Sequence, residues 1–464
     1  MTIIKSISGI RGTIGGLTGE GLSPLDIVRY AIAYSLWIKE KSCNKRPEIV
    51  IGRDARISGD MVNRLITGSL LGTGIDVIDI GMATTPTVEI AVTSEHASGG
   101  IIITASHNPG NWNALKLLNH RGEFLSGQDG KDVLEIAEHY EYLSKTKYPD
   151  VDNIGTYSEK NDYLSIHIQK ILRLPLVDVN AIRKSGFTIV VDAVNSVGGI
   201  AVPELLTSLG VATIHKLYCR PDGIFPHNPE PLPDNLTKIS RMVADKKAHA
   251  GFAVDPDVDR LAIICEDGSM FGEEYTLVSV ADYVLDNTPG NTVSNLSSTR
   301  ALSDVTVKHN GQYYPSAVGE VNVVEMMKKV SAVIGGEGNG GVIYPELHYG
   351  RDALAGIALF LSQLARSGKS CSELRAGFPE YFMVKDKVKL DNNIEPSSVM
   401  LKIKDKFINN TDAKIDETDG IKIDFKSGWV HLRRSNTEPI IRIYAESSST
   451  AKAAELARLI INEI

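Results

Sequence analysis

A short apolar segment near residue 100 constrains the fold of this chain more than any other feature. Gly99-Gly100-Ile101-Ile102-Ile103-Thr104 stops abruptly at Ala105-Ser106-His107-Asn108-Pro109. The segment is too short for a helix and too apolar for an edge strand, so we expect a strand covered on both faces, as in the parallel sheets of α/β proteins. Ligand sites in such sheets lie outside the carboxyl ends of the strands, where Ser106 and His107 would lie. An ordinary turn explains these two residues equally well.

Length, charge and cysteine content exclude several classes of protein. The chain has 464 residues, which favours about three domains of roughly 150 residues. Its 49 basic and 57 acidic residues give a net charge of −8, which argues against nucleic acid or an anionic membrane as a partner. Four well-separated cysteines and the lack of a long apolar stretch favour the cytoplasm, with no disulfide, no zinc site built from cysteines and no membrane span.

The sequence pattern in the first three quarters of the chain predicts repeated α/β units. Strands and helices alternate, and a polar segment over residues 144–160 indicates a domain boundary. Ser23 is the predicted N-cap of the first helix. The predicted strands are 48–52, 75–80, 99–104, 187–192, 213–218, 261–265, 292–295, 313–318 and 332–334. The predicted helices are 24–41, 59–72, about 199–209, 236–247, 275–285, 321–330 and 353–366.

The last hundred residues predict a separate α+β domain. Segments 415–424, 429–433 and 440–445 alternate in hydrophobicity like short strands, and a helix is expected from about residue 450 to the last residue.

Two cations in the first 120 residues are candidates for binding an anion. Arg11 lies in Ser8-Gly9-Ile10-Arg11-Gly12, whose glycines would let backbone N–H groups approach an anion. Lys116 is near enough in sequence to fold back toward Ser106. A plain turn and a solvated lysine are the competing interpretations.

The segment Asp255-Pro256-Asp257-Val258-Asp259-Arg260 is the strongest chemical indication in the chain. Three carboxylates at alternate positions of an extended loop point to one side, and their repulsion favours a bound cation. Glu266 falls where an EF-hand has its last ligand, but the sixth position, a glycine in EF-hands, is Arg260 here, and strands flank the loop. The pattern therefore favours a divalent ion, with Mg²⁺ suitable if a phosphate adds a ligand.

Two later loops have the composition of sugar and phosphate sites. Gly335 to Gly341 surrounds Glu337 and Asn339 with five glycines, which suits close approach to sugar hydroxyls. Arg433 to Pro439, with Arg442 shortly after, combines arginines, hydroxyls and an amide, which suits a phosphate.

Together these motifs resemble the four signature loops of the α-D-phosphohexomutases, which include phosphoglucosamine mutases, phosphoglucomutases and phosphomannomutases. The matching segments, in order, are Thr104-Ala105-Ser106-His107-Asn108-Pro109, Asp255-Pro256-Asp257-Val258-Asp259-Arg260, Gly336-Glu337-Gly338-Asn339-Gly340 and Arg434-Ser435-Asn436-Thr437-Glu438-Pro439. The resemblance covers essentially the whole chain. It implies three similar α/β domains with mixed sheets (residues 1–155, 156–268 and 269–370) and a C-terminal α+β domain (residues 371–464).

The resemblance also implies a role for each motif. Ser106 would be carried as phosphoserine, with one Mg²⁺ held by Ser106 and the three aspartates. The remaining catalytic group would be His107, Lys116, Arg11 and Arg260. Substrate would be bound by Glu337, Asn339, Arg434, Ser435, Asn436, Thr437 and Arg442. General acid and base duties would fall to Lys116 and His107, and a hexose bisphosphate would act as activator.

Departures from the family pattern bear on the sugar. The sugar loop commonly reads Gly-Glu-x-Ser-Gly-His, whereas this chain has Asn339 and Gly341 at the serine and histidine positions, and Ala114 replaces a usual glycine. The glycine-rich start and the sugar loop favour a phosphoglucosamine mutase, with phosphoglucomutase or phosphomannomutase as the alternative. A serine-dependent sugar phosphatase and a non-catalytic sugar-phosphate sensor are more remote. We expect a monomer or homodimer.

Overall fold

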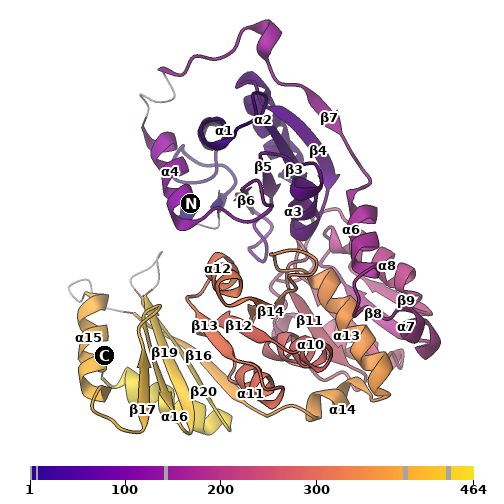
Figure 1. Ribbon diagram of the computed structural model, residues 1–464, viewed down its shortest axis with the longest axis vertical. Coiled ribbons are helices and arrows are strands. Elements are labelled where there is room, and N and C mark those ends of the chain that lie inside the picture. Colours follow the sequence, from indigo (N-terminus) through magenta and orange to yellow (C-terminus); the bar gives the residue numbers. More distant parts are fainter. Residues whose placement is uncertain (1–2, 7–8, 140–144, 390–394, 435–439, 464) are drawn as a thin grey trace. The chain divides into compact units, whose positions relative to one another are not determined.

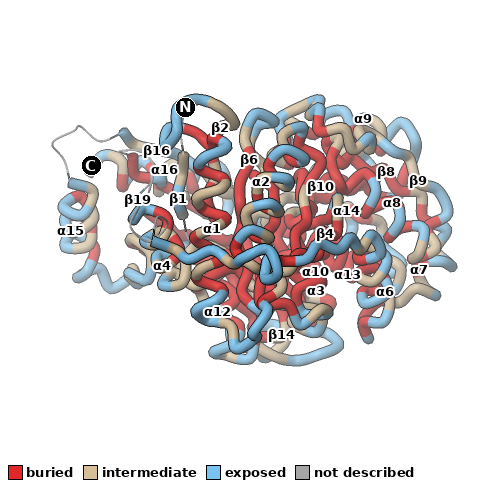
Figure 2. The backbone as a smooth tube through the Cα atoms, turned by 90° about the horizontal axis from the view of Figure 1, so that it is seen from above, coloured by how far each residue is buried: buried red, intermediate tan, exposed pale blue. Residues whose placement is uncertain are grey.

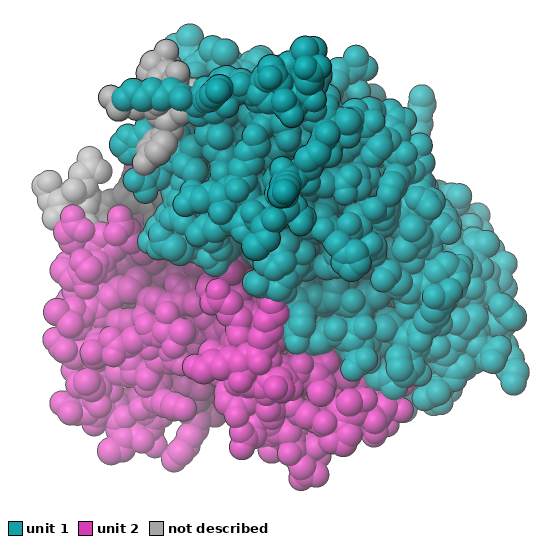
Figure 3. Space-filling view, turned by 45° about the horizontal axis from the view of Figure 1, so that its top comes forward, with its two compact units in different colours: residues 1–276, 340–374 teal, residues 277–339, 375–464 magenta. Residues whose placement is uncertain are grey.

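The computed structural model describes residues 3–6, 9–139, 145–389, 395–434 and 440–463 (Figure 1). The chain forms two compact units, residues 1–276 with 340–374 and residues 277–339 with 375–464 (Figure 3). Among the helices in the described ranges, none combines the length and the hydrophobicity that a membrane span requires.

The first sheet of unit 1 has seven strands in the order β1-β2-β6-β5-β3-β4-β7. Strand β5, predicted from the apolar segment, is buried along its whole length and pairs in parallel with β3 but antiparallel with β6. The sheet is therefore mixed. The strands are β1 (Ile3–Ser6), β2 (Gly9–Thr13), β3 (Glu48–Arg53), β4 (Asp76–Met82), β5 (Gly99–Ile103), β6 (Trp112–Leu118) and β7 (Tyr157–Glu159).

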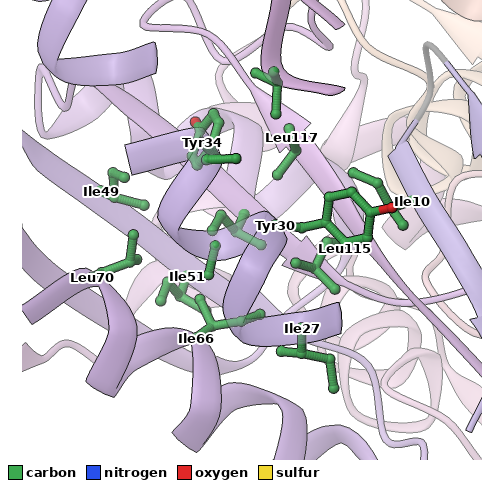
Figure 4. Packing of buried hydrophobic residues seen from close by; sticks show 14 of the residues in the cluster. Ile10, Ile27, Tyr30, Tyr34, Ile49, Ile51, Ile66, Leu70, Leu115 and Leu117 are labelled. Atoms are coloured by element: carbon green, nitrogen blue, oxygen red, sulfur yellow. The ribbon is translucent and has the colours of Figure 1, made fainter. Parts of the chain in front are cut away.

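Helices pack around this sheet and close its core. Ser23 caps the first helix as predicted, because its side chain accepts the Asp26 amide while Asp26 accepts the Ser23 amide. Figure 4 shows Tyr30 and Tyr34 of that helix among isoleucines and leucines of β3 and β6. The helices are α1 (Pro24–Lys41), α2 (Gly59–Gly72), α3 (Thr85–Ser94) and α4 (Gly127–Glu138), of which the sequence did not predict α3 and α4.

The second sheet of unit 1 has the order β11-β10-β8-β9. Strands β10 and β11 form an antiparallel pair in which every residue is buried, and Figure 2 shows the burial of β10. The strands are β8 (Thr188–Asp192), β9 (Thr213–Leu217), β10 (Ala250–Val254), β11 (Leu261–Cys265) and the short β15 (Gly341–Ile343), which lies in unit 1 outside this sheet. The helices are α6 (Tyr163–Leu172), α7 (Val179–Ser185), α8 (Gly198–Leu209), α9 (Thr237–Asp245) and α13 (Ala353–Ser367), with short 3₁₀ turns at Val151–Asn153 and Pro233–Asn235.

The third α/β segment continues in unit 2. Strand β12 pairs in parallel with both β13 and β14. Strand β14 runs on through Gly335, Gly336 and Glu337, where the sequence predicted a loop. A side chain at Gly335 would come within 2.5 Å of the Met327 sulfur, so the bare backbone lets helix and strand approach. The elements are α10 (Glu273–Asn287), β12 (Asn291–Asn295), α11 (Ala301–Lys308), β13 (Tyr313–Ser316), α12 (Glu320–Val330), β14 (Ala332–Glu337) and α14 (Cys371–Ala376).

The C-terminal part is an antiparallel sheet in the order β16-β20-β19-β18-β17, with helices α15 and α16. The single strand predicted over 415–424 is wrong, because the chain reverses between Asp416 and Ile421 through Gly420, whose φ is +73°. The elements are β16 (Phe382–Lys389), α15 (Pro396–Phe407), β17 (Ala413–Asp416), β18 (Ile421–Phe425), β19 (Gly428–Arg434), β20 (Ile440–Ser447) and α16 (Thr450–Ile461). The architecture of three α/β segments and an α+β segment is as predicted.

Candidate active site

Ser106 lies in a strained turn directly after β5. Its φ is +47°, a conformation that costs a non-glycine residue free energy. The Ser106 amide donates to Thr104 Oγ1 at 3.0 Å, and the Thr104 hydroxyl donates to Asp54 Oδ2 at 2.6 Å. These bonds hold the turn that presents the serine hydroxyl.

A buried arginine, Arg56, stabilises the same turn through hydrogen bonds to its carbonyl oxygens. The Arg56 guanidinium donates to the carbonyl oxygens of Ser106 (2.5 Å), Asn108 (2.6 Å), Pro109 (2.6 Å) and Trp112 (3.0 Å). Its Nε donates to Asp54 Oδ2 at 3.1 Å, and both side chains are fully buried. Arg56 lies in a polar loop after β3 and was not singled out from the sequence, so this support was missed.

The three aspartates lie together in the loop between β10 and β11. All three are fully buried, and one carboxylate oxygen from each lies within 4.8 Å of the others. Ser106 Oγ donates to Asp255 Oδ2 at 2.7 Å, so the serine predicted as nucleophile and the predicted metal loop meet, although 149 positions separate the two residues. Asp257 Oδ1 and Asp259 Oδ1 are buried and accept no hydrogen bond from the described residues. Such an oxygen-only set fits a hard divalent cation.

Cations surround the aspartates. Lys116 Nζ lies 2.6 Å from Asp257 Oδ2 and 3.4 Å from Asp259 Oδ2, so Lys116 contacts the aspartate loop. Arg351, which the sequence did not single out, donates to Asp259 Oδ2 at 2.9 Å. Arg260 Nε lies 3.9 Å from Asp259 Oδ1. Each of these side chains could also face a phosphoryl group on Ser106.

Two further residues of unit 1 complete this group. Burial, reinforced by repulsion from Arg260, lowers the pKa of the Arg11 guanidinium. The Thr85 hydroxyl, at the start of α3, donates to Asp257 Oδ2 at 2.6 Å, and it too was missed from the sequence. The side chains that contact the three aspartates are therefore those of Ser106, Lys116, Arg260, Arg351 and Thr85.

Burial and charge shift the pKa values of these groups in opposite directions. Burial, with repulsion from Asp259 and Asp257, raises the pKa of Asp255 well above its usual value. Burial would also raise the pKa of Asp259, but Arg351 and Lys116 outweigh it and hold that pKa well below the usual range. Of the three carboxylates, Asp255 is therefore the one that neighbouring cations stabilise least, and a divalent ion would favour its charged form.

The pKa values of the two candidate proton-transfer groups, Lys116 and His107, also shift in opposite directions. Burial alone lowers the pKa of Lys116, but Asp257 and Asp259 outweigh it and raise the pKa above its usual range. Burial, reinforced by Arg260, lowers the pKa of His107 well below its usual value. His107 Nδ1 lies 3.4 Å from Ser106 Oγ. At neutral pH Lys116 is therefore an ammonium ion and His107 a neutral imidazole.

The predicted substrate residues belong to unit 2. Glu337 is buried, and its Oε1 accepts from Asn295 Nδ2 at 2.8 Å and from the Gly319 amide at 3.2 Å. Asn339 is half-buried, and Arg434 and Arg442 are exposed on β19 and β20. Ser435, Asn436 and Thr437 lie outside the described residues.

Comparison with known proteins gives matches over nearly the whole chain. Family profiles described as "Phosphoglucomutase/phosphomannomutase" match as alpha/beta/alpha domain I (residues 3–144), domain II (165–268), domain III (272–381) and C-terminal domain (387–463). A phosphoglucomutase/phosphomannomutase of Thermococcus kodakarensis is 35% identical over 97% of this chain and 96% of its own length. A probable phosphoglucosamine mutase of Methanopyrus kandleri is 31% identical over 97% and 95%. A crystal structure of a phosphoglucomutase/phosphomannomutase family protein from Burkholderia thailandensis superposes with a TM-score of 0.83, at 24% identity, over 99% and 96% of the two chains.

Proposed function

Because this chain belongs to the phosphoglucomutase/phosphomannomutase family, we propose that it is a phosphohexomutase, an isomerase that interconverts hexose 6-phosphate and hexose 1-phosphate. One observation carries the proposal most directly: the hydroxyl of Ser106 lies 2.7 Å from a carboxylate of a buried three-aspartate loop. Phosphoryl transfer requires mainly positioning and charge neutralisation, which these residues supply.

In the proposed cycle Ser106 starts as a phosphoserine. The bond between phosphorus and Ser106 Oγ breaks while a bond forms to a free hydroxyl of the hexose monophosphate. The proton of that hydroxyl passes to a base, and Ser106 Oγ takes up a proton from an acid. The product is a hexose bisphosphate, which turns over and returns its other phosphoryl group to Ser106 Oγ. No phosphate or water is consumed, and added hexose bisphosphate would activate unphosphorylated protein.

The aspartate loop would hold one Mg²⁺. Asp255, Asp257 and Asp259, with the phosphate on Ser106, offer only oxygen ligands, as this ion prefers. When bound, the ion would neutralise charge on the transferring group. Lys116, Arg351, Arg260 and Arg11 would contribute further positive charge.

We assign proton transfer from the burial and the neighbouring charges of His107 and Lys116. His107 is neutral and partly buried, so its imidazole is able to accept the proton of the attacking hydroxyl. Lys116 is kept protonated by two carboxylates, so it would orient the phosphoryl group and serve as the acid that protonates Ser106 Oγ as it leaves phosphorus. This assignment predicts that activity falls when His107 becomes protonated.

The two remaining loops would bind the sugar phosphate. Glu337 and Asn339 would bind sugar hydroxyls, and the hydrogen bonds that Glu337 accepts from Asn295 and Gly319 fix the orientation of its carboxylate. The phosphate that is not reacting would be bound by Arg434, Ser435, Asn436, Thr437 and Arg442.

We further propose glucosamine phosphate as the preferred substrate. The glycine-rich start and the Gly-Glu-Gly-Asn-Gly-Gly loop support it, and so does the similarity to the probable phosphoglucosamine mutase of Methanopyrus kandleri. Similarity to the phosphoglucomutase/phosphomannomutase of Thermococcus kodakarensis supports glucose or mannose phosphate as the alternative. The four cysteines are free thiols, which is compatible with a cytoplasmic protein, and a monomer or homodimer is the expected state.

Phosphorus NMR would test the proposal. Phosphorylated protein with Mg²⁺ and a trace of hexose bisphosphate is offered glucosamine, glucose and mannose phosphates in separate samples. Interconversion of 1- and 6-phosphates supports a mutase, and the fastest sugar identifies the substrate. Release of inorganic phosphate alone would indicate a phosphatase, and no change despite confirmed phosphoserine would indicate a sensor. Ser106→Ala is the matched control, and substantial residual turnover in it would contradict the mechanism.

A further inference from the structure

A second group of metal-ligating side chains lies in unit 1, apart from the aspartate loop. His167 of α6, His348 from the loop after β15, and Asp352 at the start of α13 each place one ligand atom within 4.8 Å of the other two. His167 and Asp352 are fully buried, whereas the His348 side chain keeps about 10% of its surface exposed. The proposed function uses none of the three.

The atoms that converge are the two imidazole Nε2 atoms and one carboxylate oxygen. His167 Nε2 lies 2.8 Å from Asp352 Oδ2, and His348 Nε2 lies 3.2 Å from the same oxygen. Two imidazoles and a carboxylate are the ligand types that favour Zn²⁺ and similar transition ions, whereas Mg²⁺ favours oxygen.

Each converging residue is oriented by a partner on its opposite side. His167 Nδ1 lies 3.0 Å from the Thr87 hydroxyl, and His348 Nδ1 lies 3.1 Å from Glu89 Oε2. Asp352 Oδ1 accepts the amides of Leu354 and Ala355 at the N-terminus of α13. Outer partners of this kind, which fix the tautomer and direction of a ligand, are typical of metal sites.

The charge of the group fits one divalent ion. Glu89 and Asp352 contribute two negative charges in buried positions, so electroneutrality needs either two imidazolium protons or one doubly charged ion. The location therefore attracts positive charge strongly, and a metal would compete with a proton for it.

We propose that His167, His348 and Asp352 form a binding site for a divalent transition ion of the Zn²⁺ type, with Glu89 and Thr87 as outer partners. Water entering beside His348 would complete the coordination. The ion would join α6 to the segment between β15 and α13, and the outer partners Thr87 and Glu89 would extend this link to α3. Gly350 belongs to the same arrangement, because a side chain there would come within 1.9 Å of Glu89 Oε2.

The test uses the full chain without any sugar phosphate, so its result does not depend on the proposed function. Chelator-treated protein is first saturated with Mg²⁺ to fill the aspartate loop, and is then titrated with Co²⁺ and with Zn²⁺. We expect one equivalent of either ion per chain, a visible Co²⁺ spectrum with nitrogen ligands, proton release on Zn²⁺ binding, and a higher melting temperature with Zn²⁺.

Variants locate the ion. His348→Asn and His167→Gln should each weaken Zn²⁺ binding at least a hundredfold, and Glu89→Gln should weaken it about tenfold to a hundredfold. His309→Asn, in a histidine–carboxylate pair with Asp282, is the matched control and should bind normally. Asp255→Asn should also retain the Zn²⁺.

Three results would overturn the proposal. They are less than a tenth of an equivalent bound to the wild-type protein in Mg²⁺, binding that survives both histidine variants but is lost in Asp255→Asn, or an X-ray absorption spectrum of the bound zinc with oxygen ligands alone. The first and third need no variant, so misfolding of a histidine variant cannot decide the outcome. Any of them would leave a buried imidazolium–carboxylate network as the role of this group.

Discussion

Replacing Arg56 by methionine tests how the serine turn is held. Methionine keeps an unbranched apolar side chain but removes the guanidinium donors to the four loop carbonyls and to Asp54. Breaking a buried ion pair while its partner stays behind costs about 3–5 kcal/mol. Each of the four carbonyl oxygens that stays buried without a hydrogen-bond donor adds about 1–3 kcal/mol to this cost.

The expected result has a global and a local part. For a domain of this size a loss of about 3–5 kcal/mol lowers the melting temperature by about 6–20 °C. Since Ser106 needs its strained backbone to reach the aspartate loop, turnover should fall about a hundredfold, the usual effect of a 1 Å misplacement. Hydrogen exchange of the amides between residues 104 and 112 should accelerate more than exchange elsewhere.

Arg64→Met is the matched control for this experiment. Arg64 also pairs with an aspartate, Asp60, at 3.0 Å, but its side chain is 78% exposed. Such a pair contributes about 0.2–1 kcal/mol, so stability and turnover should hardly change. If Arg56→Met melted and exchanged like Arg64→Met, the bracing of the serine turn by Arg56 would be refuted.

Three other predictions follow from the structure. Burial lowers the pKa of His431 to about 4, so between pH 6.5 and 4 only the unfolded chain takes up that proton. The free energy of unfolding, measured by urea titration and Trp429 fluorescence, should therefore fall by up to about 3 kcal/mol as the pH is lowered through this range. It should fall by less in a His431→Gln variant. Arg351→Met leaves buried Asp259 without the partner that donates to it at 2.9 Å, so kcat should fall about tenfold to a hundredfold, with partial recovery in Arg351→Lys. An unchanged kcat with a raised KM would show that Arg351 contributes to substrate binding and not to the transfer step. Chelation should abolish turnover until Mg²⁺ is restored, and calorimetry of Asp255→Asn should show at least about tenfold weaker Mg²⁺ binding, whereas activity that persists in chelator would contradict the metal assignment.

The sequence alone predicted the parts of this protein that local chemistry specifies. The alternation of apolar strands and helices gave the α/β class, and Ser23 gave the exact start of α1. Alternate carboxylates between two apolar strands gave the acidic loop, because close like charges require a cation whatever surrounds them. The four motifs in order gave the family, which the family profiles confirm. The domain boundaries after residues 155, 268 and 370 stay a prediction.

Other elements could not be predicted because the evidence for them is not local. Glycines break the expected pattern in β14, where close approach of Met327 permits the strand to continue. The predicted 415–424 strand concealed a turn at Gly420, because apolar and polar residues alternate on both sides of it.

What only the tertiary structure decided is which charged side chains share one buried space. Arg56, Arg351 and His348 each have the sequence context of an ordinary polar loop residue. Folding brings them to Ser106, Asp259 and Glu89 across separations of 50, 92 and 259 positions. A charge is costly to bury without a partner, and the partner is chosen by the packing of β-strands and helices rather than by neighbours in the sequence. The sequence therefore specified the chemistry of each loop, and the fold decided which loops act together.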